Sequence, residues 1–258
     1  AGVLGLGGLV GLVTAPLFAR REQRRTFVFL VAFTNYVYLP LPIAEGLFGD
    51  AGVQAILLCN VGGQLVFWSL GPWILQGRLS GRQLGRQLAL NPGLLATAAG
   101  IVVALWVPGA GAWEKVSAGE ASAGAFLAGA VVQALAMLGS LTVPLSLLVI
   151  GARLAELAAR AGRPSKALVG VLLSRLVLTP ALTVALVWVL GLAGWPLPEV
   201  ARMSTYLISA MAVGFTCMMF AERFGGDVHL TAQSIFYTTF FSLLTAPGLF
   251  AAVRWLGL

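Results

Sequence analysis

The stretch "FTNYVYLPLPIAEGLFG", residues 33–49, decides how this chain is interpreted, because it places two prolines inside an almost uncharged apolar run. A proline inside a helix removes one backbone hydrogen bond and clashes with the preceding turn, at a cost of about 3 kcal/mol. Pro40 and Pro42 are therefore expected to unwind a turn of a helix. Asn35, which comes shortly before them, brings an amide that can bind exposed backbone groups or a ligand.

The chain as a whole has the composition of a membrane protein. Of its 258 residues, 59% are hydrophobic and only 10% are charged, and the mean hydropathy is +0.93. That much apolar surface exceeds what a single core can bury. The apolar runs are mostly about 17–25 residues long, which is the length that a helix needs to cross a hydrocarbon layer of about 30 Å. The sequence therefore predicts an all-α, polytopic membrane protein.

About eight spanning segments are predicted from the spacing of the apolar runs. Arginines gather in every second loop, first in "RREQRR" at residues 20–25 and again in a long basic loop at residues 77–93. Because basic loops mark the cytoplasmic side, both termini of this chain are expected outside. The same topology explains the net charge of +7, so no nucleic-acid partner is expected. The predicted segments cover residues 3–19, 26–47, 53–76, 92–107, 124–152, 167–192, 200–222 and 230–252.

The break near Pro40 is expected at the middle of the bilayer, about 20 Å from the cytoplasmic end of its helix. Many secondary transporters build their substrate site from broken helices that meet at this depth. Half-helix N-termini then carry positive partial charge, whereas unwound carbonyls attract cations. A simple kink is the alternative, but a Pro-x-Pro sequence with Asn35 nearby favours a break. A partner break is expected within residues 200–222, where small residues around Gly214 permit unwinding.

Three stretches of the chain resemble the auxin efflux carrier family. They are "TNYVYLPLPIAEGLFGDAG" at residues 34–52, "LTVPLSLLVIGARLAEL" at residues 141–157 and "AERFGGDVHLTAQSIFYTTFFSLLTAPGLF" at residues 221–250. In that family, an Asn precedes a proline-bearing break in a crossover helix, and the penultimate helix runs into a motif like "Ae.yg.d". The likeness covers about residues 20–252.

The resemblance implies a ten-helix transporter of two inverted repeats, with a scaffold domain and a mobile core whose two crossover helices enclose the substrate. Residues 1–90 would be the remainder of the first repeat, with residues 26–47 as its crossover; about two helices of that repeat are absent here. Residues 91–258 would be the second repeat, with residues 200–222 as its crossover. The implied substrates are organic anions such as auxin or small dicarboxylates.

The same resemblance assigns the substrate-binding positions by motif. Two departures from the family pattern, Ala212 in place of a frequent proline and Thr216 in place of a frequent asparagine, predict a less unwound second crossover. The implied positions are Asn35, Pro40 and Pro42 in the first crossover, and Met211, Ala212, Gly214 and Thr216 in the second.

Two further polar residues lie inside predicted spans. An intramembrane arginine is costly, so Arg175 is predicted either to attract the substrate anion or to extend its side chain to the cytoplasmic interface. Asn60 is a lesser candidate for the substrate site, because such amides usually join neighbouring helices. The chain has a single histidine, His229, and its acids fall near segment ends. No metal site, no cofactor and no enzymatic activity are therefore expected.

These observations predict a secondary carrier of small organic anions that works by alternating access. The coupling ion is left open between H⁺ and Na⁺. A sodium-coupled symporter of the bile-acid type, with the same fold, is one alternative, and a non-transporting scaffold subunit is another. The expected setting is the plasma (inner) membrane of a bacterium, with the lipid bilayer and the anion as partners and a homodimer as a possible assembly.

Overall fold

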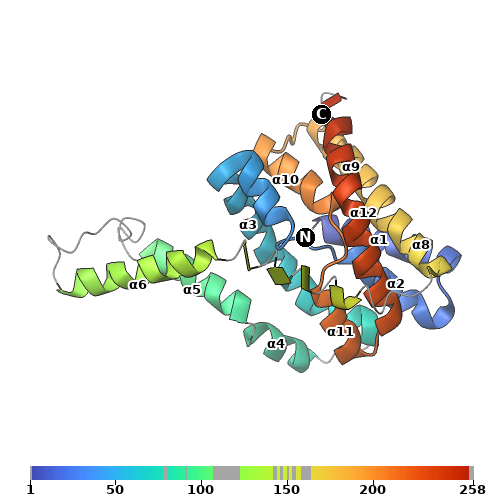
Figure 1. Ribbon diagram of the computed structural model, residues 1–258, viewed down its shortest axis with the longest axis horizontal. Helices are drawn as coiled ribbons and strands as arrows, with labels where there is room; N and C mark the ends of the chain where they lie inside the picture. Colours follow the sequence, from blue (N-terminus) through green and yellow to red (C-terminus); the bar gives the residue numbers. More distant parts are fainter. Residues whose placement is uncertain are drawn as a thin grey trace.

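The computed structural model describes residues 2–77, 81–90, 92–106, 123–141, 144–145, 148–149, 151–152, 155–157 and 164–255. In these ranges the chain is helical and contains no strand, which confirms the predicted all-α class. Most helices form one bundle, whereas α5 and α6 reach away from it (Figure 1). The stretch at residues 141–157, which carries part of the family resemblance, lies largely outside the described residues.

The first two helices pack closely against each other. Helix α1 (Gly2–Phe18) and helix α2 (Arg24–Ala32) are joined by the short turn η1 (Arg21–Gln23). A side chain added at Gly7 would place its Cβ 2.6 Å from the Val31 carbonyl oxygen, and one at Gly11 would lie 3.0 Å from Val28 Cα. The spacing of small residues in α1 therefore lets the two backbones approach each other.

Helix α3 (Pro40–Gln76) consists of two arms, because Gly49 interrupts it with φ 56° and ψ −143°. Glycine tolerates this positive φ without steric cost, so the chain turns here. The turn lies between the segments predicted at residues 26–47 and 53–76. The second arm ends at Gly77, where Arg25 Nη1 donates to the Gln76 carbonyl at 3.1 Å.

Three helices lead away from the bundle. They are α4 (Gly81–Ala89), α5 (Pro92–Trp106) and α6 (Ala123–Ser140). The basic stretch at residues 77–93 was expected to be a loop, and this expectation is wrong for its middle, which is helical. Arg82 and Arg86 recur at helical spacing there and are exposed, as is usual for a helix on a membrane surface.

The second half of the described chain begins with one long helix in three parts. Helix α8 (Lys166–Leu173) continues through a single π-helical stretch, η3 (Ser174–Leu178), into α9 (Thr179–Leu192). Helices α10 (Glu199–Ala210), α11 (Thr216–Phe224) and α12 (Val228–Trp255) follow. Three described helices are long and apolar enough to cross a membrane, namely residues 40–76, 166–192 and 228–253.

Asp227 explains part of the motif shared with the auxin efflux carriers. It directly precedes α12, and its Oδ1 accepts a hydrogen bond from the Leu230 N–H at 2.9 Å. Its Oδ2 accepts another from Gln23 Nε2 at 2.8 Å, and its own N–H donates to Thr26 Oγ1 at 2.9 Å. The aspartate therefore caps α12 and ties it to the start of α2.

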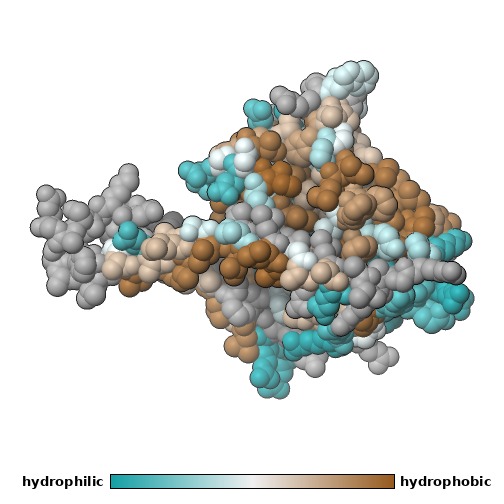
Figure 2. Space-filling model, viewed as in Figure 1, coloured by the Kyte–Doolittle hydropathy of each residue, from teal (hydrophilic) through white to brown (hydrophobic). Residues whose placement is uncertain are grey.

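Aromatic side chains hold α2, the second arm of α3 and α11 together. The ring centroids of Phe67 and Phe220 lie 4.2 Å apart, and those of Phe33 and Phe67 lie 4.9 Å apart. Phe29 stacks on Phe220 at 6.1 Å. Outside this core, Figure 2 shows hydrophobic side chains over much of the visible face and hydrophilic ones gathered around its rim. An apolar face of this extent suits a bilayer.

Candidate functional site

Two helices of the bundle are broken, and the breaks contact each other. The first break, residues 33–39, separates α2 from α3, and the second break, residues 211–215, separates α10 from α11. Thr34 and Val213 form an antiparallel bridge. The Asn35 N–H donates to the Ala212 carbonyl at 2.8 Å, and the Gly214 N–H donates to the Phe33 carbonyl at 3.1 Å. Unwound backbone is thereby paired inside a layer that offers it no water.

The prolines of the first break do not lie where the sequence predicted. Pro40 and Pro42 stand in the first turn of α3, and the unwound residues precede them. At the first turn of a helix the N–H has no intrahelical partner, so a proline there costs nothing. The prediction that Pro40 and Pro42 themselves unwind was therefore wrong in position. They mark where the chain becomes helical again.

The second break is shorter than the first, at five residues (211–215) against seven (33–39). Met211, Ala212 and Gly214 are buried, whereas Thr216 is exposed at the start of α11. A Cβ added at Gly214 would lie 3.1 Å from the Thr34 carbonyl oxygen. Glycine therefore suits this close pairing, because a Cβ here would press the Thr34 carbonyl away by a few tenths of an ångström.

Hydroxyl groups complete the pairing of the second break. Thr34 Oγ1 lies 3.2 Å from the carbonyl oxygens of Ile208 and Met211, and 3.1 Å from that of Ala212. Its single hydrogen is therefore shared among several acceptors at the end of α10. On α12, Thr238 Oγ1 accepts a hydrogen bond from the Val213 N–H at 3.1 Å.

Asn35 lies at the point where the breaks meet and is only 3% exposed. Its Oδ1 accepts a hydrogen bond from the Tyr38 N–H at 3.0 Å, which fixes the orientation of the amide. Its Nδ2 is buried and has no hydrogen-bond partner. A buried donor without a partner is destabilising, so a ligand that accepted this hydrogen bond would remove that cost.

Arg175 is fully buried in the π-helical stretch η3. The alternative that its side chain extends to the interface is therefore wrong. Its N–H donors point at backbone carbonyls at the C-terminal ends of the two broken helices. A direct contact between Arg175 and a substrate anion stays a prediction. Nε donates to Met211 at 3.1 Å, Nη1 to Val31 at 3.4 Å, and Nη2 to Ile208 at 3.2 Å and Ser209 at 3.1 Å.

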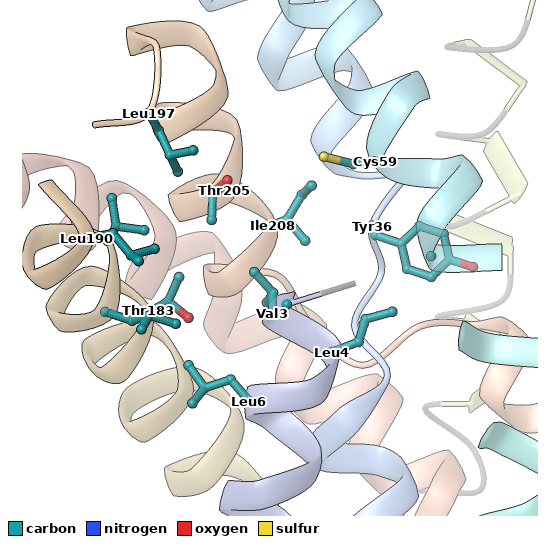
Figure 3. A pocket seen from close by; sticks show the side chains of 14 residues that line it. Val3, Leu4, Leu6, Tyr36, Cys59, Thr183, Leu190, Leu197, Thr205 and Ile208 are labelled. Carbon is teal, nitrogen blue, oxygen red and sulfur yellow. The ribbon is translucent and has the colours of Figure 1, made fainter. Parts of the chain in front are cut away.

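A cavity of about 230 Å³ opens beside the breaks, between the start of α1, the second arm of α3, α9 and α10. Figure 3 shows Tyr36 and Cys59 on one side of it, and Leu190, Leu197 and Thr205 on the other. Its lining is mainly apolar, and none of the predicted site residues belongs to it. Tyr36, however, is the direct neighbour of Asn35, so the cavity adjoins the first break.

Asn60 is not brought to the breaks by any hydrogen bond among the described residues. It is half-buried on α3, and its Oδ1 has no partner. No group of three or more His, Cys, Asp or Glu side chains that could hold a metal ion occurs in the described ranges.

Sequence reasoning missed the hydroxyl groups of the site. Thr34 precedes Asn35, and Thr238 lies on α12, but threonines in apolar helices usually bond to their own helix, as Thr205 does to the Ala201 carbonyl at 2.7 Å. No local pattern distinguishes a threonine that bonds to its own helix from one that bonds to a different element. The position of Thr34 within a predicted break was the one available signal.

Comparisons with known proteins show which family the chain belongs to. A family model described as membrane transport protein matches residues 82–250, which is more than half of the chain. The chain is also 24% identical over 244 residues to the uncharacterized transporter MJ1031 of Methanocaldococcus jannaschii, covering 93% of this chain and 72% of that protein. The predicted membrane and transport assignments are thereby confirmed. The chain belongs to the membrane transport protein family, the family of the auxin efflux carriers.

Proposed function

We propose that this membrane transporter is a secondary carrier of small organic anions, auxin-like or dicarboxylate-like, that works by alternating access. One observation supports the proposal above the others: the two breaks pair with each other and leave the buried Asn35 Nδ2 without a partner. A carboxylate oxygen of the substrate accepts that hydrogen bond. The substrate site lies between the first and the second break, as in other carriers with discontinuous helices.

The charge distribution at the breaks favours an anion. The C-terminal ends of α2 and α10 carry negative partial charge, and Arg175 and Thr34 donate hydrogen bonds to their carbonyls. The N-terminal ends of α3 and α11 carry positive partial charge and have no acidic residue in their first turns. The field left at the breaks is therefore positive, which favours a carboxylate.

The first turn of α3 contributes the positive partial charge of a helix N-terminus but no free N–H donor. Pro40 and Pro42 have no N–H, and the Leu41 N–H donates to the Val37 carbonyl at 2.9 Å. The Asn35 amide therefore offers the substrate a buried donor at the first break that no protein group occupies. The adjoining cavity, which Tyr36 lines, accepts the apolar part of the molecule.

The transport movement involves the bundle as one body. The two broken helices are joined by backbone hydrogen bonds, whereas α5 and α6 lie apart from them (Figure 1). In this proposal, residues 1–90 and 91–258 belong to two inverted repeats, and the antiparallel pairing of the breaks supports that relation. Both termini lie outside a bacterial plasma membrane, in keeping with the alternation of basic loops.

Reconstitution tests the proposal. The purified protein in liposomes is expected to take up at least one member of a panel of mono- and dicarboxylates. Asn35→Ala is expected to reduce uptake at low substrate concentration by about tenfold or more, because a hydrogen bond to a charged group contributes about 1.5–3 kcal/mol. Gln54→Ala, which removes an exposed amide from α3, is the control and is expected to leave uptake unchanged.

The same assay separates the alternatives. Uptake that disappears when Na⁺ is replaced by choline would favour a sodium-coupled symporter of the bile-acid type, and a pH gradient tests H⁺ in the same way. A scaffold subunit predicts no flux for any substrate. Absence of flux across the panel, or an Asn35→Ala variant with unchanged uptake, would contradict the proposal.

A further inference from the structure

Arg175 is one of the largest fully buried side chains in the described part of the chain. None of the described acids is among its hydrogen-bond partners, which are all backbone carbonyls. Val31 lies in the last turn of α2, and Ile208, Ser209 and Met211 lie at the end of α10. A buried charge without a counter-ion is costly, so these carbonyls must supply the compensation.

The partial charges of the two helix ends match one cation. The C-terminal end of a helix carries about −0.5 elementary charge, because its last carbonyls have no intrahelical partner. Two such ends meet at Arg175, and together they amount to about one negative charge. The guanidinium therefore neutralises both ends, and neither end needs water or a metal ion.

We propose that Arg175 is a built-in cation and positioning residue: it ties the carbonyl ends of α2 and α10 together and so holds both breaks in the geometry that the substrate meets. In carriers with discontinuous helices, such carbonyl ends are where coupling cations bind. Here the chain itself supplies the positive charge. This inference rests on the proposed function for its link to transport, but its structural part can be tested without a substrate.

The surroundings of Arg175 fix its side chain in place. The π-helical stretch shifts the register of the long helix at this residue, and Thr179 Oγ1 donates to the Ser174 carbonyl at 2.8 Å. Ser174 Oγ donates to Thr14 Oγ1 on α1 at 2.9 Å. Such π-helical turns occur frequently at functional sites, because they aim a side chain that a regular helix would direct elsewhere.

Arginine is the one side chain suited to this position. Its planar group presents five N–H donors in a fixed fork, so it reaches carbonyls on two different helices at once. A lysine ammonium has its donors at a single point and cannot bridge the same oxygens. The Arg175→Lys variant is therefore expected to keep the positive charge but to lose the hydrogen bonds that join α2 to α10.

The first experiment tests chemical rescue of the Arg175→Ala variant by guanidinium. Thermal unfolding in detergent is the measurement. The melting temperature of the variant is expected to fall clearly below that of the wild type, and to rise again in millimolar guanidinium chloride. Urea has nearly the same shape without the charge, and it is expected to give no recovery. Arg86→Ala, which removes an exposed charge from α4, is the control and is expected to match the wild type with and without guanidinium.

The second experiment measures transport by the same variants in liposomes. Arg175→Ala is expected to lose about tenfold or more of its uptake, with partial recovery in guanidinium but not in urea. A positioning residue affects mono- and dicarboxylates by the same factor, whereas a residue that touches the anion would affect the dicarboxylate more. A larger loss for the dicarboxylate would overturn the positioning role.

The outcomes separate this inference from the proposed function. Thermal rescue by guanidinium in a protein that transports nothing would support the role of Arg175 and contradict the carrier. A folded Arg175→Ala variant that guanidinium does not stabilise would overturn the inference, even if the wild type transports. If Arg175→Ala does not fold, Arg175→Gln replaces it, and a Gln variant with wild-type melting temperature and uptake would equally overturn it.

Discussion

The first and the second break differ in sequence, yet they pair with each other along the same few residues. The first break holds Asn35 and is followed by Pro40 and Pro42, which start α3. The second break, residues 211–215, contains neither asparagine nor proline. Four of its five residues, from Met211 to Gly214, are buried.

This difference shows that prolines are not what keeps a helix open in this protein. The second break has no residue that forbids a helix, but its polar backbone groups have better partners elsewhere. The Ala212 carbonyl accepts from the Asn35 N–H, the Met211 carbonyl from Arg175, and the Val213 N–H donates to Thr238. A break persists in lipid when each freed group finds such a partner.

The largest expected effect comes from enlarging Gly214, where the two breaks are closest. In Gly214→Val, the Cβ alone would lie 3.1 Å from the Thr34 carbonyl oxygen, and the two methyl groups need further space. The backbone pairing must open, which is expected to abolish uptake and to lower the free energy of unfolding by about 3 kcal/mol. Denaturant unfolding in detergent and liposome uptake measure the two effects.

Gly248→Val is the matched control for this change. A Cβ at Gly248 meets no atom within 4 Å, so the variant is expected to keep both uptake and stability. Equal behaviour of the two valine variants would show that the close approach of the breaks is not required.

A smaller effect is expected from Thr34→Val, which keeps the shape of the side chain and removes its hydroxyl. The carbonyls of Ile208, Met211 and Ala212 then lose a shared donor. We expect the free energy of unfolding to fall by about 1–2 kcal/mol, with the loss confined to the second break. Hydrogen exchange of the amides at residues 211–215 locates the change.

Thr245→Val serves as the comparison for the lost hydroxyl. Thr245 Oγ1 is buried without a hydrogen-bond partner, so its removal is expected to be neutral or stabilising. If Thr34→Val proved as stable as Thr245→Val, the hydroxyl of Thr34 would have no part in holding the second break open.

The smallest effect is expected from Ala212→Pro, which gives the second break the proline that it lacks. Met211 already has φ −73° and ψ 154°, the extended conformation that a residue before proline prefers. The Ala212 carbonyl also remains available to Asn35. We therefore expect the melting temperature to change little, corresponding to less than about 1 kcal/mol.

Ala210→Pro is the contrasting variant, because Ala210 is the last residue of α10. A proline there removes a helical hydrogen bond and is expected to cost about 3 kcal/mol. A reversed order of stability, with Ala212→Pro the weaker protein, would mean that the second break is held open by forces other than its backbone partners.

Prediction from the sequence succeeded where local chemistry decides the structure. Apolar runs of spanning length predicted an all-α membrane chain, whereas only three described helices are long and apolar enough to cross a membrane, so the count of eight spans stays a prediction. The Pro-x-Pro sequence after Asn35 predicted a break in the right segment. It misplaced the unwound residues, because a proline is tolerated in the first turn of the helix that follows. It also left Arg175 between two roles, because the partners of that side chain lie on α2 and α10, far away in the chain.

The sequence by itself determined that this chain is an all-α membrane protein with one helix broken near Pro40, since hydropathy, charge alternation and proline chemistry act over a few residues. Its resemblance to a known family indicated a transporter. The sequence predicted a second break within residues 200–222, but only the tertiary structure decided that it falls at residues 211–215, that the breaks pair at Thr34 and Val213, and that Arg175 points at both carbonyl ends. The physical reason is that an unwound backbone in lipid has no water to bind. Its conformation is therefore fixed by donors and acceptors from other helices, which local sequence does not reveal.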